Sequence, residues 1–132
     1  MTKKELATLN HNKGYNCCQA VVCAYSKELG IPEDVLFKAA EGFGLGMGGM
    51  ECTCGAVSGA VMVAGLKNST ANLDMPNSKA ATYQLSKKLV SAFCEKNGSV
   101  ICKDLKGIET GNVLRSCAGC IEDAVELIEE ML

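Results

Sequence analysis

The sequence contains no Trp, and only three Tyr and three Phe among its 132 residues. It has no basic excess of the kind that nucleic-acid binding requires, because 13 Lys and Arg stand against 15 Asp and Glu. The longest uncharged run, Cys52 to Leu66, has 15 residues, fewer than the roughly 20 that span a bilayer. We therefore expect neither nucleic-acid binding nor membrane insertion.

The N-terminal segment also lacks the apolar stretch of a secretory signal, since residues 1–12 carry positive charge without an apolar run. This predicts a cytoplasmic protein whose thiols are kept reduced. No general acid–base pair, nucleophilic triad or phosphate-binding loop stands out either. We do not expect hydrolysis or group transfer.

Cysteine, by contrast, is abundant, with nine residues or about 7% of the chain. Apolar residues make up 48% of the positions, which is enough for a core without disulfide bonds. The count is odd, so at least one thiol stays unpaired or binds another group. Many cysteines in a reducing compartment indicate metal binding or redox chemistry.

Helical periodicity dominates the sequence, and strand-like alternation is scarce. We expect one all-α domain over residues 1–132, a compact bundle of five or six helices. Its centre is the uncharged Gly/Ala-rich segment 54–66, because a helix that is apolar on every face belongs inside a bundle. That segment could also serve a homodimer contact. Further helices are expected at about 2–10, 15–29, 33–41, 77–97 and 113–131, the last with an acidic outer face of Glu122, Asp123, Glu126, Glu129 and Glu130.

Glycines cluster in Gly44-Leu-Gly46-Met-Gly48-Gly49, which fits the Gly-x-Gly-x-x-Gly pattern of dinucleotide-binding folds. That pattern has meaning only after a strand and with an acidic residue about 20 positions later. Here a helix is expected before it, and residues 64–73 contain no Asp or Glu. We interpret the segment as a sharp loop that brings Glu51 and the Cys52-Thr-Cys54 pair to the core.

The segment Cys117-Ala-Gly-Cys120 has the C-x-x-C spacing of dithiol oxidoreductases. It lacks both the βαβ context of a thioredoxin and the following His of a c-type haem motif. Cys117 is expected in the first turn of a helix, where the helix dipole favours a reactive or metal-ligating thiolate. Cys120 either takes part in redox chemistry or packs as a small hydrophobic residue.

The remaining cysteines divide by their neighbours. In Cys17-Cys18 and in Cys52-Thr-Cys54, at most one thiol of each pair is expected to reach a shared site, because adjacent helical residues point about 100° apart. Cys23 and Cys94 are expected to fill space in the core. The single His11 is expected in a solvent-exposed polar loop.

Five segments, in order along the chain, together match one known pattern. They are Gly14-Tyr-Asn-Cys17 with Gln19-Ala-Val21, Gly42-Phe-Gly-Leu-Gly-Met-Gly48, Cys54-Gly-Ala-Val-Ser-Gly59, Phe93 with Gly98-Ser99 and Cys102-Lys-Asp-Leu105, and Cys117 with Ile121-Glu-Asp-Ala124. Across roughly residues 14–130 the chain resembles a bacterial and archaeal family of cysteine-rich proteins, described as redox-active and named for its cysteine pattern, C-GCAxxG-C-C.

The resemblance implies that four cysteines are the principal ones of the family, and that the other five are additional. The family is also similar to the cluster-bearing domain of split-Soret cytochromes, which implies an iron-sulfur cluster rather than haem here. The four principal cysteines are Cys17, Cys54, Cys102 and Cys117, and the additional ones are Cys18, Cys23, Cys52, Cys94 and Cys120.

Four thiolates from separate segments can hold a [2Fe-2S] or [4Fe-4S] cluster, or tetrahedral zinc. The leading hypothesis is an iron-sulfur protein that passes electrons to a redox partner protein. A second hypothesis needs no cofactor and is a thiol–disulfide protein, in which Cys52 and Cys120 act as resolving partners. A third is a structural or sensing zinc module.

Overall fold

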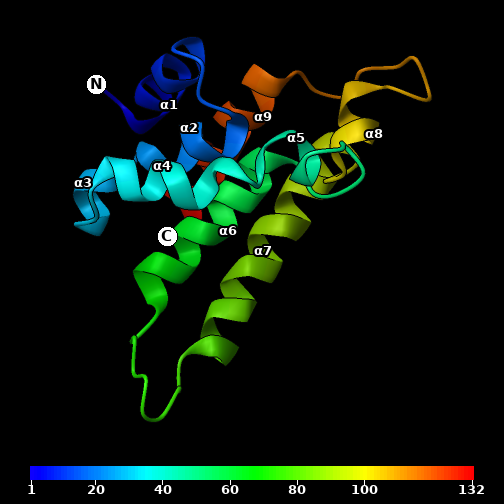
Figure 1. Cartoon of the computed structure of the whole chain (residues 1–132). Coiled ribbons are helices and arrows are strands. Elements are labelled where there is room, and N and C mark those ends of the chain that lie inside the picture. Colours follow the sequence, from blue (N-terminus) through cyan, green and yellow to red (C-terminus); the bar gives the residue numbers. More distant parts are fainter.

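The computed structural model describes all 132 residues, and helices are its only regular elements apart from one isolated antiparallel bridge between Thr53 and Ile101 (Figure 1). The predicted all-α class is confirmed. The expected five or six helices correspond to six helices of seven or more residues, to which the structure adds three short ones. No helix is both long enough and apolar enough to cross a bilayer. The helices are α1 Lys3–Asn12, α2 Cys17–Cys23, α3 Ser26–Leu29, α4 Glu33–Glu41, α5 Gly44–Met47, α6 Gly55–Asn68, α7 Lys79–Asn97, α8 Cys102–Lys106 and α9 Cys117–Met131.

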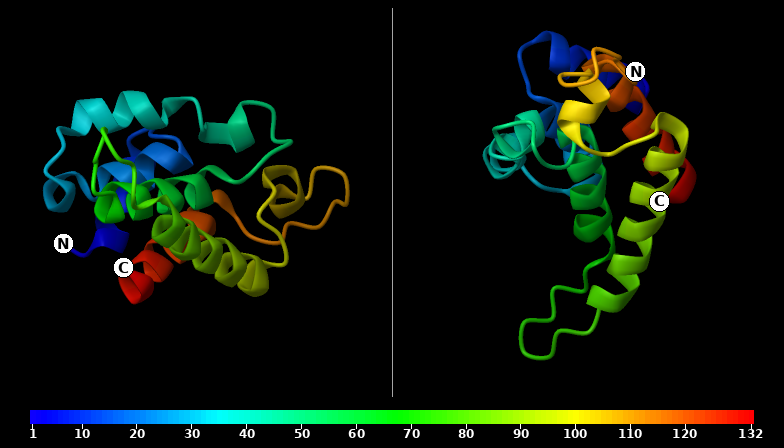
Figure 2. Two further views of the ribbon diagram at one scale, coloured as in Figure 1. Left: turned by 90° about the horizontal axis from the view of Figure 1, so that it is seen from below. Right: turned by 90° about the vertical axis from the view of Figure 1, so that its right-hand side faces the viewer.

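Helix α6 lies at the centre, as its uncharged sequence predicts, and packs against α2, α7 and α9 (Figure 1). Small residues allow this close packing. A Cβ on Gly59 would lie 3.0 Å from the Cβ of Val21, and a Cβ on Gly55 would lie 3.1 Å from the main-chain nitrogen of Cys18. The two glycines therefore let the N-terminal part of α6 approach α2 closely. Beyond this contact, the connection between α6 and α7 extends away from the other helices (Figure 2).

The prediction of one continuous helix over residues 15–29 is wrong, because the structure has two helices there. The first, α2, begins at Cys17, where Asn16 forms a capping box with Gln19, and ends at Cys23. The chain then turns so that the Tyr25 ring enters the core, and it resumes as α3. The final helix likewise starts at Cys117 rather than near residue 113, because the Ser116 side chain accepts the first-turn hydrogen bond.

The glycine-rich segment forms the sharp loop that the sequence predicts, with φ near +60° at Leu45, Gly46 and Met47. Gly46 is required there, because a Cβ would lie 2.5 Å from the Cβ of Cys102. No strand precedes the loop, so the dinucleotide-binding pattern lacks its structural context. The expectation that the loop carries Glu51 into the core is wrong: this carboxylate stays exposed and pairs with Lys103 at 2.9 Å, since burial would remove its hydration.

The acidic outer face predicted for α9 is wrong at one position. Asp123 is only 1% exposed, whereas Glu129 and Glu130 are exposed as predicted. A buried carboxylate is tolerated here because Arg115 and Lys96 both form ion pairs with it.

Candidate functional site

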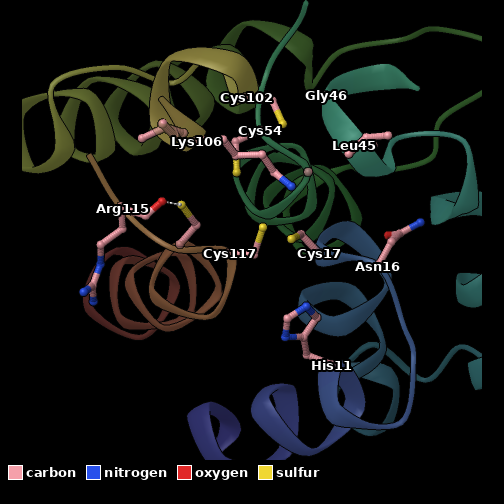
Figure 3. Close-up of a pocket in the computed structure, with 13 residues that line it drawn as sticks. His11, Asn16, Cys17, Leu45, Gly46, Cys54, Cys102, Lys106, Arg115 and Cys117 are labelled. Carbon is pink, nitrogen blue, oxygen red and sulfur yellow. Dashed lines mark hydrogen bonds between the residues drawn. The ribbon is translucent and has the colours of Figure 1, made fainter. Parts of the chain in front are cut away.

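A single cavity of about 200 Å³ collects the four cysteines that the family resemblance singles out. Cys17, Cys54, Cys102 and Cys117 all line it, and Figure 3 shows their side chains surrounding one space. Cys120 lines the same cavity as a fifth cysteine. Five thiols from distant parts of the chain therefore share one site, although their chemical roles stay predictions.

Each of the four cysteines stands where a helix begins. Cys17, Cys102 and Cys117 are the first residues of α2, α8 and α9, and Cys54 is the N-cap of α6. The positive ends of helix dipoles thus face the cavity, with the largest contribution from α6 and α9, which have 14 and 15 residues. Such an environment favours thiolates over thiols.

Main-chain hydrogen bonds hold the cysteines of α6 and α8 beside one another. The Cys54 nitrogen donates to the Val100 oxygen at 2.7 Å, and the Cys102 nitrogen donates to the Cys52 oxygen at 2.9 Å. These bonds join the segment before α6 to the segment before α8. Cys54 and Cys102 are consequently placed by backbone pairing across almost 50 residues of sequence.

Cys54 is the most acidified thiol of the cavity. The neighbouring Cys120 thiol, followed by the main-chain N–H groups of Ala56 and Val57 and the charge of Lys106, lowers the pKa of Cys54 to about 7 against the effect of burial. For Cys120 the sign is opposite, since the adjacent Cys54 and burial both raise its pKa. The pair therefore has one thiol that ionises readily and one that keeps its proton.

Burial is the main influence on the pKa of two of the other thiols, Cys17 and Cys102. Burial, with the nearby Cys117 and Cys54, raises the pKa of Cys17. Burial also raises the pKa of Cys102. At both cysteines burial outweighs the nearby positive charge of Lys106, so Cys17 and Cys102 hold their protons more tightly than an ordinary thiol.

Lys106 lines the cavity, and it was not among the site residues predicted from the sequence. Its amine is directed into the cavity (Figure 3). Burial alone would lower the pKa of Lys106, but the contact with Cys117 and the nearby Cys102 and Cys17 raise it. A usable signal was present, because Lys106 lies four residues after Cys102 and so on the same face of a helix.

The single histidine is placed differently from the prediction. His11 lies in the last turn of α1 rather than in a loop, and it is half-buried at the lining of the cavity. Sequence patterning could not show this, because the cavity wall at His11 forms only when α1 packs against α2 and α9.

The other cysteines lie outside the cavity. Cys18 and Cys23 are buried in the core, and burial raises the pKa of Cys18 to about 12 and that of Cys23 to about 11. Cys52 is exposed and does not line the cavity. The prediction that Cys94 fills the core is wrong, since it lies on the solvent side of α7, next to the inward-facing Phe93.

The residues present fit an iron-sulfur cluster by their donor chemistry. Thiolates are the usual ligands of such clusters, and here the cavity offers five sulfur atoms beside one lysine amine. As they stand, no three Cys, His, Asp or Glu side chains are grouped closely enough to hold a single metal ion.

The fold and the cavity define a small all-α protein in which cysteines at several helix starts surround one site. The chain matches, over residues 15–131, the family described as "Putative redox-active protein (C_GCAxxG_C_C)". It belongs to this family, which confirms the resemblance of the five segments. No curated protein and no solved structure matches the chain.

Proposed function

We propose that the protein binds a [2Fe-2S] or [4Fe-4S] cluster through Cys17, Cys54, Cys102 and Cys117 and exchanges electrons with a redox partner protein in the reducing cytoplasm. The observation that carries the proposal is the convergence of these four thiols, each at a helix start, on one cavity. Dispersed cysteines of this kind are suited to a shared cluster.

The cluster, when bound, supplies one-electron redox chemistry. The chain supplies charge compensation, because four thiolates bring negative charge into a mostly buried site. Lys106 and the starts of α6 and α9 provide positive charge and dipoles. The N–H groups of Ala56 and Val57, at the start of α6, help to lower the pKa of Cys54. N–H groups directed at the sulfur atoms of a cluster raise its reduction potential.

The burial of the four thiols suggests where electrons would enter and leave. Cys54 and Cys102 are each 5% exposed, whereas Cys17 and Cys117 are half-buried. The Cys17–Cys117 side is therefore the accessible edge of the site. We place the contact with the partner protein at this edge.

Anaerobic reconstitution with iron and sulfide tests the proposal. The purified chain should become coloured and retain iron and acid-labile sulfide, and Cys→Ser substitution at any of the four positions should reduce both strongly. Cys52→Ser and Cys94→Ser are the matched controls, because both cysteines are exposed and lie outside the cavity. Colourless, iron-free protein after reconstitution would exclude the cluster.

A second candidate is thiol–disulfide exchange, which the pairing of Cys54 with Cys120 favours. One of these thiols is acidified to a pKa of about 7 and the other stays protonated, as an attacking and a resolving thiol would. A low-molecular-mass disulfide as oxidant would take two electrons and two protons from the pair, so that one Cys54–Cys120 bond forms while the S–S bond of the oxidant breaks to give two thiols. Peptide mapping after such oxidation should find this bond, while metal analysis separates cluster, zinc and metal-free forms.

A further inference from the structure

Asp123 is the only acidic side chain of the chain that is fully buried. Its carboxylate accepts two hydrogen bonds from Arg115, from Nε at 3.0 Å and Nη2 at 3.2 Å. Asn97 Nδ2 donates to it at 3.1 Å, and Lys96 Nζ forms an ion pair at 3.0 Å. Every position around the carboxylate is thus occupied by a donor, as a buried charge requires.

The side chain of Arg115 reaches Asp123 by running along the start of α9. It crosses Gly119, where a Cβ would lie 2.5 Å from Arg115 Cζ. Gly119 and Asp123 are four residues apart and so lie on one face of α9, and Arg115 lies just before the helix begins. Gly119 therefore provides the space through which the guanidinium reaches the buried carboxylate.

The other end of Arg115 faces the cavity. The Cys120 thiol donates a hydrogen bond to the main-chain oxygen of Arg115 at 4.0 Å, whereas the guanidinium of Arg115 points away from the sulfur atoms (Figure 3). The Arg115 nitrogen also donates to the Leu105 oxygen at 3.3 Å, which ties it to α8. Arg115 thus connects the buried Asp123 to the position of one particular thiol.

Helix α9 offers two cysteines to the same cavity. Cys117 and Cys120 are three residues apart and share a helix face, so both could compete for one ligand position. The two cysteines differ in their surroundings. Cys117 is half-buried and in contact with Lys106. Cys120 is 2% exposed, and its single thiol proton has two alternative acceptors, the Arg115 oxygen and the Cys54 sulfur.

We propose that the Arg115–Asp123 ion pair is a clamp that holds Cys120 out of the ligand set, so that Cys117 is the cysteine that α9 contributes to the cluster. The clamp keeps the Arg115 oxygen in place as an acceptor for the Cys120 thiol, which then acts as a hydrogen-bond donor and not as a ligand. This inference rests on the proposed function. It makes Arg115, Gly119 and Asp123 positioning residues.

Alkylation of the metal-free chain tests the clamp without any cluster. Arg115→Gln and Gly119→Ala should each speed iodoacetamide modification of Cys120 by about tenfold or more relative to Cys18, because local opening exposes the thiol. Cys18 is a core thiol and serves as the internal reference for global unfolding. Glu122→Gln is the matched control: Glu122 is 3.9 Å from Arg115 at the surface, and its loss should leave the ratio unchanged.

The outcomes distinguish failure of the clamp from failure of the proposed cluster binding. An unchanged Cys120 to Cys18 ratio in both variants, or an equal rise at both thiols, would overturn the clamp. After reconstitution, Cys120→Ser should retain iron, Cys117→Ser should lose it, and Cys117→Ser combined with Arg115→Gln should recover part of it through Cys120. Loss of iron in Cys120→Ser with retention in Cys117→Ser would also overturn the clamp, whereas absence of iron from every chain would overturn only the proposed function.

Discussion

Cys17 and Cys117 lie 100 residues apart in the sequence, yet each is the first residue of a helix and both line the same cavity. Helices α2 and α9 pack against each other and both pack against α6, which brings the two helix starts together. Their proximity adds to the pKa rise that burial imposes on Cys17. Two neutral thiols can coexist there, but two thiolates need a cation between them.

Lys106→Gln should weaken cluster retention by about tenfold and shift its reduction potential to more negative values, because one positive charge is lost beside the thiolates. Iron loss to a chelator and redox titration measure the two effects. Lys106→Arg should behave much like the unmodified chain. Lys103→Gln is the matched control, since Lys103 lies on the same helix but pairs with Glu51 and Glu109 outside the cavity. Equal effects of the two Gln variants would contradict the role of Lys106.

Cys54 in the metal-free chain should be alkylated with a half-maximal rate near pH 7, whereas an ordinary thiol requires a pH near 9. Because its native pKa is lowered, ionised Cys54 adds stability above pH 9, and this contribution is lost as the pH falls through about 7. Cys120→Ala removes the main cause of the lowered Cys54 pKa and should therefore move the pH profile of Cys54 alkylation to higher pH. A Cys54 profile centred at pH 9 in the unmodified chain would refute the acidification.

The core thiols should limit stability in alkali. Burial raises the pKa of Cys18 to about 12 and that of Cys23 to about 11, so the folded state holds their protons more tightly than the unfolded state. The resulting stability is fully present below pH 9 and declines as the pH rises from about 9 to 12. Cys18→Ala should flatten this decline in urea unfolding curves, at a cost of about 1 kcal/mol at pH 7. Cys94→Ala, at the surface, should leave the decline unchanged.

Gly46→Ala should disturb the site as well as the backbone. The new Cβ would meet Cys102 at 2.5 Å in a residue with φ of +57°, so we expect a loss of about 2 kcal/mol in unfolding free energy together with weaker cluster binding. Gly48→Ala separates the two effects, because Gly48 also has positive φ but has open space around it. That variant should lose stability while its cluster content per folded molecule stays normal. Normal cluster content in folded Gly46→Ala would show that Cys102 tolerates the displacement.

Local features of the structure were readable from the residues. The uncharged α6 is central, α7 ends at Asn97 as expected, and Cys117 lies in the first turn of α9, although this helix begins later than predicted. These features depend on near neighbours along the chain, through helix periodicity and capping. The sequence also predicted that at most one thiol of each neighbouring cysteine pair reaches a shared site. The cavity accordingly contains Cys17 without Cys18 and Cys54 without Cys52.

The convergence of the cysteines depends on contacts between residues that are distant in sequence. Asp123 resembles a surface residue in the sequence, but the packing of α9 on α7 buries it and Arg115 and Lys96 neutralise its charge. Lys106 and Cys120 join the site for the same reason, since α8 and α9 reach the cavity only through helix packing. The positions of the helices follow from local periodicity. The spatial grouping of the thiols and charges depends instead on the close packing of the other helices against α6.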